Sequence, residues 1–164
     1  MAAMRVRDPR PHHNSVRDVL GEPVTASERS TILGVLDAFY DAHNTHSPAS
    51  AGALYASEGV HREVAGRRER SGREEIQRGL ETFLTAFPDA RWEPYTCTLA
   101  PGRAAVSYVL TGSLRSALGE ISPTGQRLEL EGVHVFWIGG LGIEQVKDYW
   151  DAGTFISQMQ KSPS

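Results

Sequence analysis

The early part of the chain carries two stretches with the hydrophobic period of an amphipathic helix. The first runs from Ser27 to about His43, where apolar side chains recur every three or four residues. Ser27 is a suitable N-cap and Glu28 places an acidic group in the first turn, so the helix is expected to begin there. A loop at 44–50 and a short helix at 51–55 are expected to follow.

The second helical stretch covers residues 71–87. Ser71 and Glu74 have the spacing of a capping box, and Pro88 ends the pattern. Between the two helices, residues 60–64 are predicted to form a short strand. The charged residues 66–71 are predicted to form a solvated loop rather than an anion site.

From residue 91 onward the period of the pattern changes from helix to strand. Strands are predicted at 91–99, 103–118, 127–138 and 143–151, followed by a closing helix at 152–160. Turns rich in proline and glycine separate these strands, and Pro94 indicates an edge position or a bulge in the first of them. Helices followed by long successive strands are typical of an α+β fold, with a curved antiparallel sheet wrapped around the N-terminal helices.

Length and composition fit one globular domain. Of the 164 residues, 40% are hydrophobic and 23% charged. Residues 1–25, rich in arginine, proline and histidine, are predicted to be a flexible arm, and residues 26–161 the folded domain. A single cysteine, Cys97, excludes an internal disulfide and is expected to be half-buried in a strand.

Several classes of function find no support in the composition. The net charge of −3 gives no global reason to expect nucleic-acid binding, and no cysteine–histidine cluster indicates zinc. No apolar run approaches the ~20 residues that span a bilayer, and no secretory signal is recognisable. We therefore expect a cytoplasmic protein with neither a nucleic-acid nor a membrane partner.

The last predicted hairpin brings an imidazole and a carboxylate together. Pairing that is symmetric about Leu141 matches Gly139 with Ile143 and places His134 opposite Asp148 on one face. A bulge at the glycines would shift this register by one residue. The rest of the same face is apolar and consists of Phe136, Ile138, Val146 and Trp150.

A histidine–aspartate pair on an apolar surface has two interpretations. Burial raises the pKa of a carboxylate and lowers that of a histidine, whereas their mutual attraction acts in the opposite sense on both. Such a pair can move a proton near neutral pH, as general acid–base catalysis requires. It can equally be a structural ion pair or hydrogen bond, and the residues alone leave both interpretations open.

Several short segments carry a family resemblance through their order and spacing. They are Phe-Pro-Asp at 87–89, Gly-Arg-Ala-Ala-Val at 102–106, Thr-Gly at 111–112, the turn at 119–127 and Asp-Tyr-Trp-Asp at 148–151. Together they resemble the SnoaL-like polyketide cyclases of the nuclear transport factor two-like superfamily, relatives of the limonene epoxide hydrolases, over roughly residues 30–160. The resemblance implies a cone-shaped α+β barrel with an internal pocket.

The resemblance also implies a reaction. SnoaL-like cyclases close a ring by intramolecular aldol condensation on an aromatic polyketide, with neither metal nor cofactor. Their acid–base aspartate matches Asp148 and a pocket histidine matches His134. On this hypothesis Asp148 removes an acidic C–H proton, while His134 orients it or holds an oxygen atom. A small hydrophobic or aromatic substrate is expected, and no cofactor.

Other residues are candidates for contact with that substrate. Aromatic side chains on helical stripes more often pack in a core than bind a ligand, and polar residues after a helix are often exposed. The candidates are Phe39, Tyr40, Asn44, His61, Phe83, Phe87, Tyr108 and Trp150.

Two other functions stay open. A non-catalytic ligand-binding protein of the same fold would keep the pocket but tie Asp148 to a structural partner. An epoxide hydrolase needs an Asp–Arg–Asp arrangement, and its second and third members should come from the strand that holds Ser107, Tyr108 and Val109. No Arg–x–Asp occurs there, so this alternative ranks last.

All three hypotheses predict a homodimer. The outward face of the last hairpin carries Val135, Trp137 and Tyr149, which suit a partner surface. Symmetric dimers are the commonest way to cover such a face.

Overall fold

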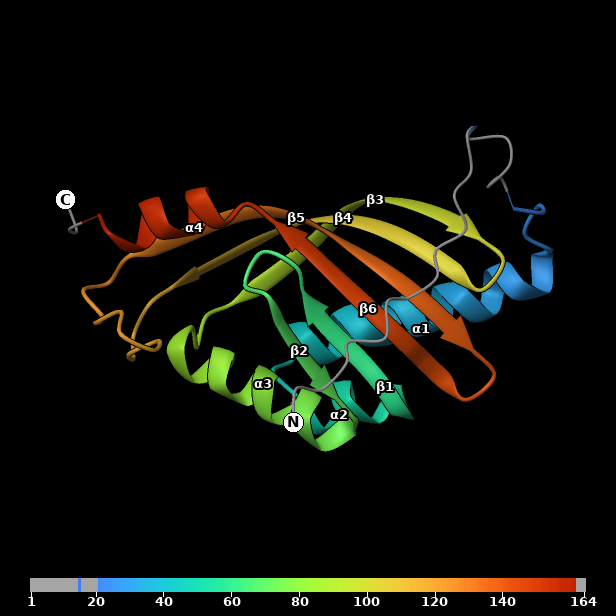
Figure 1. Cartoon of the computed structure of the whole chain (residues 1–164), viewed down its shortest axis with the longest axis horizontal. Helices are drawn as coiled ribbons and strands as arrows, with labels where there is room; N and C mark the ends of the chain where they lie inside the picture. Colours follow the sequence, from blue (N-terminus) through green and yellow to red (C-terminus); the bar gives the residue numbers. More distant parts are fainter. Residues whose placement is uncertain (1–14, 16–20, 162–164) are drawn as a thin grey trace, which may run out of the picture.

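The computed structural model describes Ser15 and residues 21–161, so most of the expected arm, residues 1–25, lies outside the described residues. The described part contains a helical layer and one sheet (Figure 1). Its elements are, in chain order, α1 (Ala26–Asn44), α2 (Pro48–Ala53), β1 (Tyr55–Glu63), β2 (Arg68–Ser71), α3 (Arg73–Ala86), β3 (Arg91–Ala100), β4 (Arg103–Ser113), β5 (Arg127–Gly139), β6 (Gly142–Trp150) and α4 (Ala152–Met159).

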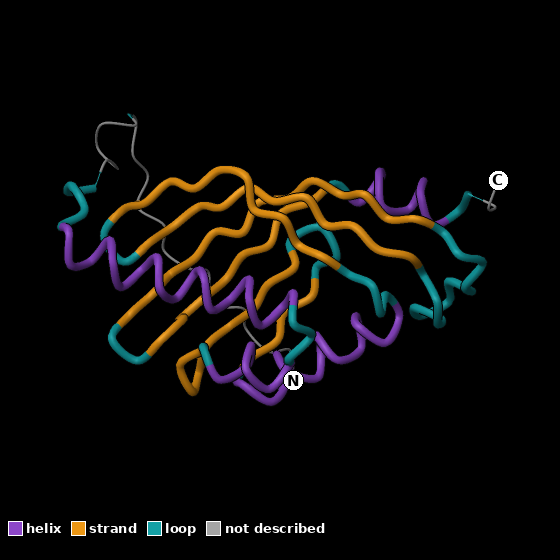
Figure 2. Tube along the Cα trace, turned by 180° about the vertical axis from the view of Figure 1, so that it is seen from behind, coloured by secondary structure: helices purple, strands orange, loops and turns teal. Residues whose placement is uncertain are grey.

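The sheet has six strands in the order β2-β1-β6-β5-β4-β3. It curves around α1, α2 and α3, while α4 lies beside the start of β5 (Figures 1 and 2). The predicted α+β cone with N-terminal helices is confirmed. The sheet is mixed rather than wholly antiparallel, because β1 runs parallel to β6. It is also open, with β2 and β3 at its edges.

The N-cap of helix α1 lies two residues earlier in the sequence than the predicted Ser27. Its N-cap is Thr25, whose side-chain oxygen accepts a hydrogen bond from the backbone N–H of Glu28 at 3.2 Å. The Glu28 carboxylate in turn accepts one from the backbone N–H of Thr25 at 3.0 Å. This reciprocal capping box outcompetes Ser27, because two helix-end donors gain partners at once.

The segment between the first and third helices contains more strand than predicted. Helix α2 begins at Pro48, and the expected helical residue Tyr55 instead starts β1. Residues 68–71, predicted to be a loop, form the edge strand β2, whose charged side chains suit a solvent-facing edge.

Helix α3 is capped differently from the prediction. Ser71 ends β2, and Gly72 is the N-cap with a φ of 82°. The backbone N–H of Ser71 donates to the carboxylate of Glu75, so the predicted pairing of Ser71 with Glu74 is wrong. A left-handed residue was needed to turn from strand to helix, and glycine adopts that conformation freely.

The edge position or bulge that Pro94 predicted is confirmed in β3. β3 is an edge strand, and its register against β4 shifts between Pro94 and Thr96. Cys97 is exposed on this strand rather than half-buried, because much of β3 faces away from the core. β4 ends at Ser113, earlier than predicted, and the chain then loops out through an isolated bridge between Leu118 and Ile121.

The hairpin of β5 and β6 pairs as predicted in its interior but not at its tip. Gly139 pairs with Gly142, so the symmetric pairing about Leu141 is wrong there. The register then shifts beyond Ile138, and His134 faces Asp148 as predicted. One extra residue on β6 therefore compensates for the shorter turn.

Candidate active site

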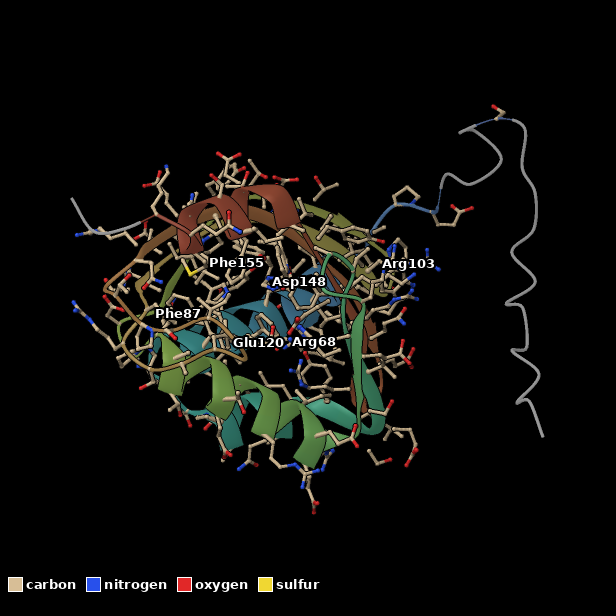
Figure 3. All side chains as sticks on the ribbon, turned by 60° about the vertical axis from the view of Figure 1, so that its left-hand side comes forward. Arg68, Phe87, Arg103, Glu120, Asp148 and Phe155 are labelled. Atoms are coloured by element: carbon tan, nitrogen blue, oxygen red, sulfur yellow. The ribbon has the colours of Figure 1, made fainter. Side chains whose placement is uncertain are left out.

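The space between the curved sheet and the helices contains a cavity of about 190 Å³. All four helices and all six strands contribute residues to its wall. Most of the wall is apolar, and Asp148 and Phe155 lie toward it in Figure 3. Representative apolar residues are Leu80, Phe83, Leu110, Leu130, Trp150 and Phe155.

The pairing of the strands creates a polar row on the inner face of the sheet. Arg68 pairs with Glu63, Glu63 with Asp148, and Asp148 with His134. Residues paired across neighbouring strands share a face, so all four side chains project to the same side. All four line the cavity.

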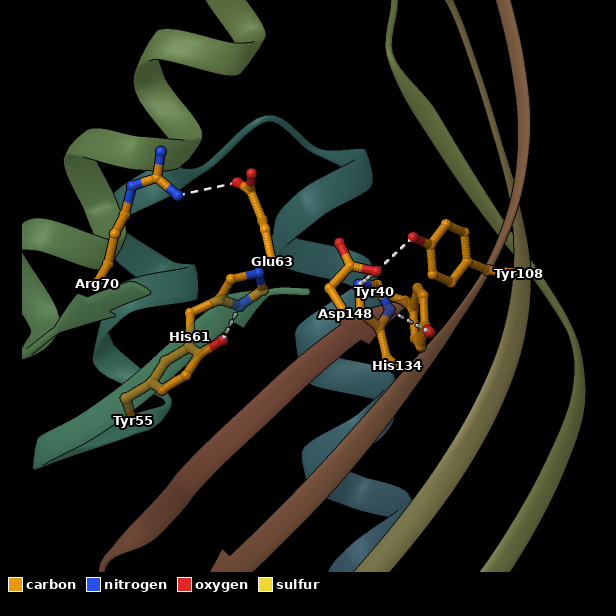
Figure 4. Close-up of polar contacts among 8 residues, drawn as sticks. All are labelled: Tyr40, Tyr55, His61, Glu63, Arg70, Tyr108, His134 and Asp148. Atoms are coloured by element: carbon orange, nitrogen blue, oxygen red, sulfur yellow. Dashed lines mark hydrogen bonds and ion pairs between the residues drawn. The ribbon is translucent and has the colours of Figure 1, made fainter. Parts of the chain in front are cut away.

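Asp148 is held at one carboxylate oxygen. The Tyr108 hydroxyl donates to Oδ1 at 2.6 Å, and Nε2 of His134 lies 3.6 Å from the same atom (Figure 4). Oδ2 has no hydrogen-bond partner among the described residues. Every solvent-inaccessible side-chain oxygen or nitrogen of the described residues has a hydrogen-bond partner. Because Oδ2 has none, it is accessible, and its access is through the cavity. This oxygen is the atom with which a ligand can interact.

The environment of Asp148 favours its ionised form. Burial by itself raises the pKa of this carboxyl group. The charge of His134, its hydrogen bond and the hydrogen bond from Tyr108 act in the other direction and hold the pKa below its usual value. The pKa of Tyr108 is raised by burial and by the neighbouring charge of Asp148, so its hydroxyl remains a donor.

Tyr40 fixes the orientation of His134. Its hydroxyl lies 2.8 Å from Nδ1 of this almost fully buried ring. Burial and then the charge of Asp148 raise the pKa of Tyr40, so its hydroxyl keeps its proton and can donate it to Nδ1. In the neutral ring, the hydrogen then sits on Nε2, the nitrogen nearest Asp148. The ring of Tyr108 stacks on His134, with centroids 4.3 Å apart.

A second tyrosine–histidine pair faces the same cavity. The hydroxyl of Tyr55 lies 2.9 Å from Nδ1 of His61, and the rings of His61 and His134 are 6.4 Å apart. Burial is the main reason that the pKa of His61 falls to about 4, so this ring is neutral near pH 7. Its Nε2 has no hydrogen-bond partner among the described residues and is not sealed off.

Several residues that line the cavity or support it were missed from the sequence, among them Arg68. His43 ends the apolar stripe of α1, and its Nδ1 lies 2.8 Å from the carbonyl oxygen of Phe39. Burial lowers the pKa of His43 to about 3. The helical period did place it on the buried face. Tyr55 and the pair Arg70–Glu63, with 2.9 Å between Nη1 and Oε1, carried no comparable signal, because strands β1 and β2 were misassigned.

The predicted site residues are not all at the cavity. Asp148, His134, His61, Tyr108, Phe83 and Trp150 line it. Tyr40 reaches it through His134, as described above. Phe39 and Phe87 are fully buried in the core and are not part of the cavity wall. The side-chain amide of Asn44 instead bonds both the N–H and the carbonyl of Trp92, at 2.8 Å each.

Neither a metal cluster nor a membrane span is found in the described part. Within residues 21–161, no group of three or more histidine, cysteine, aspartate or glutamate side chains is arranged to hold a metal ion. No helix in the same range combines the length and apolar character needed to cross a membrane.

An open cone of sheet over helices, with ionisable groups in an apolar cavity, is the architecture of the nuclear transport factor two and ketosteroid isomerase class. The chain belongs to the SnoaL-like polyketide cyclase family, whose model matches residues 33–159. No curated protein sequence matches the chain.

Solved structures show the same fold at low sequence identity. A polyketide cyclase candidate from Xanthomonas campestris pv. campestris is similar with a TM-score of 0.74 and 20% identity, covering 81% of this chain and 99% of that one. A protein of ketosteroid isomerase-like fold from Catenulispora acidiphila, in complex with trimethylamine, gives 0.68 and 16%, covering 79% and 97%. AclR, a hydroxylase candidate from Streptomyces galilaeus, gives 0.69 and 19%, covering 85% and 89%.

Proposed function

We propose that the chain is a cofactor-independent cyclase or isomerase-type enzyme that closes a ring by an aldol-type reaction within an aromatic, polyketide-like substrate. The family supplies the class of reaction. One observation carries the proposal: Asp148 is fixed at Oδ1 by Tyr108 and near His134, while Oδ2 is open to an apolar cavity. A base needs this combination of rigid support and one free lone pair.

The reaction begins with proton transfer to Asp148. Oδ2 accepts a proton from a substrate carbon, and the electrons of the broken C–H bond delocalise into the neighbouring carbonyl as an enolate. Because the pKa of Asp148 is held low, this base suits only a strongly acidified carbon, such as one between two carbonyl groups. The conjugated substrate therefore supplies much of the stabilisation.

Ring closure then produces an alkoxide that needs a donor. The enolate carbon attacks a second carbonyl carbon of the same molecule, forming the C–C bond and leaving negative charge on oxygen. When the Tyr55 hydroxyl donates to Nδ1 of His61, the hydrogen of the neutral His61 ring is on Nε2. This N–H can stabilise the negative charge of the alkoxide. Protonated Asp148 returns its proton to the alkoxide, which regenerates the carboxylate.

The central test compares the wild type with Asp148→Asn, using polycyclic substrates that carry an acidic C–H and a second carbonyl. Products are followed by mass and by chiral separation, with thermal melts to verify folding. Asp37→Asn is the matched control, because Asp37 is exposed on α1 and away from the cavity. We expect turnover to collapse only in Asp148→Asn. Equal turnover in all three proteins would rule out this role for Asp148.

A binding protein without catalysis is the second candidate. The short hydrogen bond from Tyr108 to Asp148, at 2.6 Å, favours it, because a carboxylate with a strong structural partner is a weaker base. This candidate predicts that ligands bind while no variant and no wild-type sample turns them over.

The epoxide hydrolase alternative gains nothing from β4, whose inward residues between 104 and 110 are Ala104, Val106, Tyr108 and Leu110.

We also propose that two copies associate through the outward face of β5 and β6. Tyr149 on this face is 43% exposed, and Trp137 lies under the cations of Arg103 and Lys147, at 5.4 and 5.0 Å from its ring centroid. Sedimentation at micromolar concentration should give a dimer, and Tyr149→Lys should weaken it. A wild-type monomer under those conditions would contradict the proposal.

A further inference from the structure

Among the described residues, Arg68 is an exposed cation at the rim of the cavity that has no hydrogen-bond or ion-pair partner. Arg68 and Arg70 are the two arginines of the β1–β2 hairpin that line the cavity, whereas Arg62 and Arg67 do not. Arg70 is bound to Glu63 through a contact of 2.9 Å. Arg68 makes no hydrogen bond or ion pair with any other described residue, although it faces the cavity, as Figure 3 illustrates.

The neighbouring negative charges are already matched. Glu63 lies opposite Arg68 in the strand pairing, but its carboxylate is bound to Arg70. Asp148, one strand further along, is stabilised by Tyr108 and His134. Arg68 is therefore the charge in this row that is available to a ligand.

The separation between Arg68 and Asp148 is set by the sheet. They lie two strands apart in register, which places their Cα atoms ~10 Å from each other. The hairpin is also fastened directly to the base, because the backbone N–H of Val64 donates to the carbonyl of Asp148 at 2.9 Å. A ligand that spans the cavity thus meets a cation and a proton acceptor at a fixed distance.

We propose that Arg68 binds a carboxylate of the substrate, so that the cavity accepts aromatic carboxylic acids whose acidic C–H lies at the opposite end, next to Asp148. This inference rests on the proposed function, because it treats the cavity as the substrate pocket. A guanidinium group matches a carboxylate with two parallel hydrogen bonds. The positive charge of the guanidinium offsets the repulsion between that carboxylate and Asp148.

The test measures binding, not turnover. Dissociation constants for naphthoate and for its neutral, equally shaped analogue naphthamide are determined with the full-length wild type, Arg68→Gln, Arg68→Lys and Arg62→Gln. Arg62→Gln is the matched control, since it removes an equal charge from the same hairpin at an exposed position outside the cavity wall. Thermal melts establish that all four proteins are folded.

We expect the wild type to prefer naphthoate, and Arg68→Gln to weaken naphthoate binding by about fivefold while leaving naphthamide unchanged. Arg68→Lys should retain part of the preference, and Arg62→Gln all of it. The proposal fails if the wild type binds naphthamide as tightly as naphthoate, if it binds neither, or if Arg62→Gln loses the preference as fully as Arg68→Gln.

These outcomes are distinguishable from failure of the proposed function. Loss of the carboxylate preference leaves the proton transfer by Asp148 intact, and it would redirect the search toward neutral esters and ketones. Conversely, turnover that survives Asp148→Asn would remove the catalytic proposal but would leave any measured preference of Arg68 for carboxylates standing.

Discussion

At the scale of single residues, the two oxygens of Asp148 have different surroundings. Oδ1 is bound by Tyr108 and lies 3.6 Å from His134, and Oδ2 opens to the cavity. The pairing of His134 with Asp148 was predictable from hairpin register. The contributions of Tyr40 and Tyr55 were not, because hydroxyl contacts between elements far apart in sequence depend on how the helices and β1 pack.

Tyr108→Phe should shift the pH dependence of the reaction. The substitution keeps the ring that stacks on His134 but removes the hydrogen bond that helps to lower the pKa of Asp148. Because the base must be ionised, kcat/KM rises with pH through that pKa. The acidic limb of the profile should therefore move to higher pH in the variant.

The matched control is Tyr95→Phe, which removes a hydroxyl from a residue that is 57% exposed on β3. Its profile should coincide with that of the wild type. An unchanged acidic limb in Tyr108→Phe would show that this hydroxyl does not influence the base.

His61→Gln should lower kcat more than it changes KM. A donor that stabilises a developing alkoxide typically contributes about 100-fold to the rate, and glutamine retains a polar group without the same geometry. The ring is neutral near pH 7, with a pKa of about 4, so the wild-type activity should not decline through ionisation of His61 between pH 6 and 8. Steady-state kinetics of the two proteins over that range provide the measurement. A kcat equal to that of the wild type would exclude the donor role.

At the scale of elements, the hairpin of β5 and β6 and its neighbour β4 position the site. The period-two pattern located these strands because the alternation of apolar and polar positions along them is long and regular. It missed β2, whose four residues are three charged groups and a serine, since an exposed edge strand has no apolar face to detect. It also misjudged the starts of α1 and α3, where a competing cap or a left-handed glycine decided the boundary.

Gly132→Ala should disturb the site through β5. Gly132 pairs with Tyr108 across the sheet, and a methyl group at this position would collide with the hydroxyl and ring of that tyrosine. Tyr108 would have to move from Asp148. We expect a loss of activity together with a loss of about 1–3 kcal/mol in the free energy of unfolding.

Gly34→Ala is the control for this substitution. Nothing lies within contact distance of a methyl group at Gly34, which is exposed within α1. It should stabilise the protein by about 0.5–1 kcal/mol and leave activity unchanged. Chemical denaturation measures both effects, and an active, fully stable Gly132→Ala protein would contradict the proposed geometry.

At the scale of the whole molecule, the curved sheet over helices leaves a cavity that holds several ionisable groups away from water. The α+β class and the order of elements followed from the sequence, because the pattern changes period at residue 91. The mixed pairing of the sheet did not, since nothing in β1 or β6 indicates that they run parallel. Because two of the buried groups are neutral histidines, the free energy of unfolding depends on pH.

The free energy of unfolding should decrease as the solution is acidified from pH 6.5 toward pH 4. His43 and His61 have folded-state pKa values of about 3 and about 4, below their ordinary value of 6.5. The unfolded chain therefore binds more protons in this range, and stability rises with pH. Each histidine contributes a slope of up to about 1.4 kcal/mol per pH unit.

His43→Gln should make that dependence shallower, because one of the two buried rings is gone. Urea unfolding at several pH values measures the slope. Asp148, whose pKa is also lowered, affects stability only in more acidic solution, below its ordinary value of 3.8, so its contribution is separable. Slopes that are equal in the two proteins would refute the assignment to His43.

The most direct test of the central claim follows the proton itself. A polycyclic 1,3-diketone carries the acidic C–H between its two carbonyl groups but lacks the further carbonyl that the enolate would attack, so it cannot cyclise. Exchange of that hydrogen for deuterium in heavy water therefore reports proton transfer alone. NMR should show that the wild type and Asp37→Asn accelerate the exchange, whereas Asp148→Asn does not. Acceleration that persists undiminished in a folded Asp148→Asn protein would contradict the assignment of Asp148 as the base.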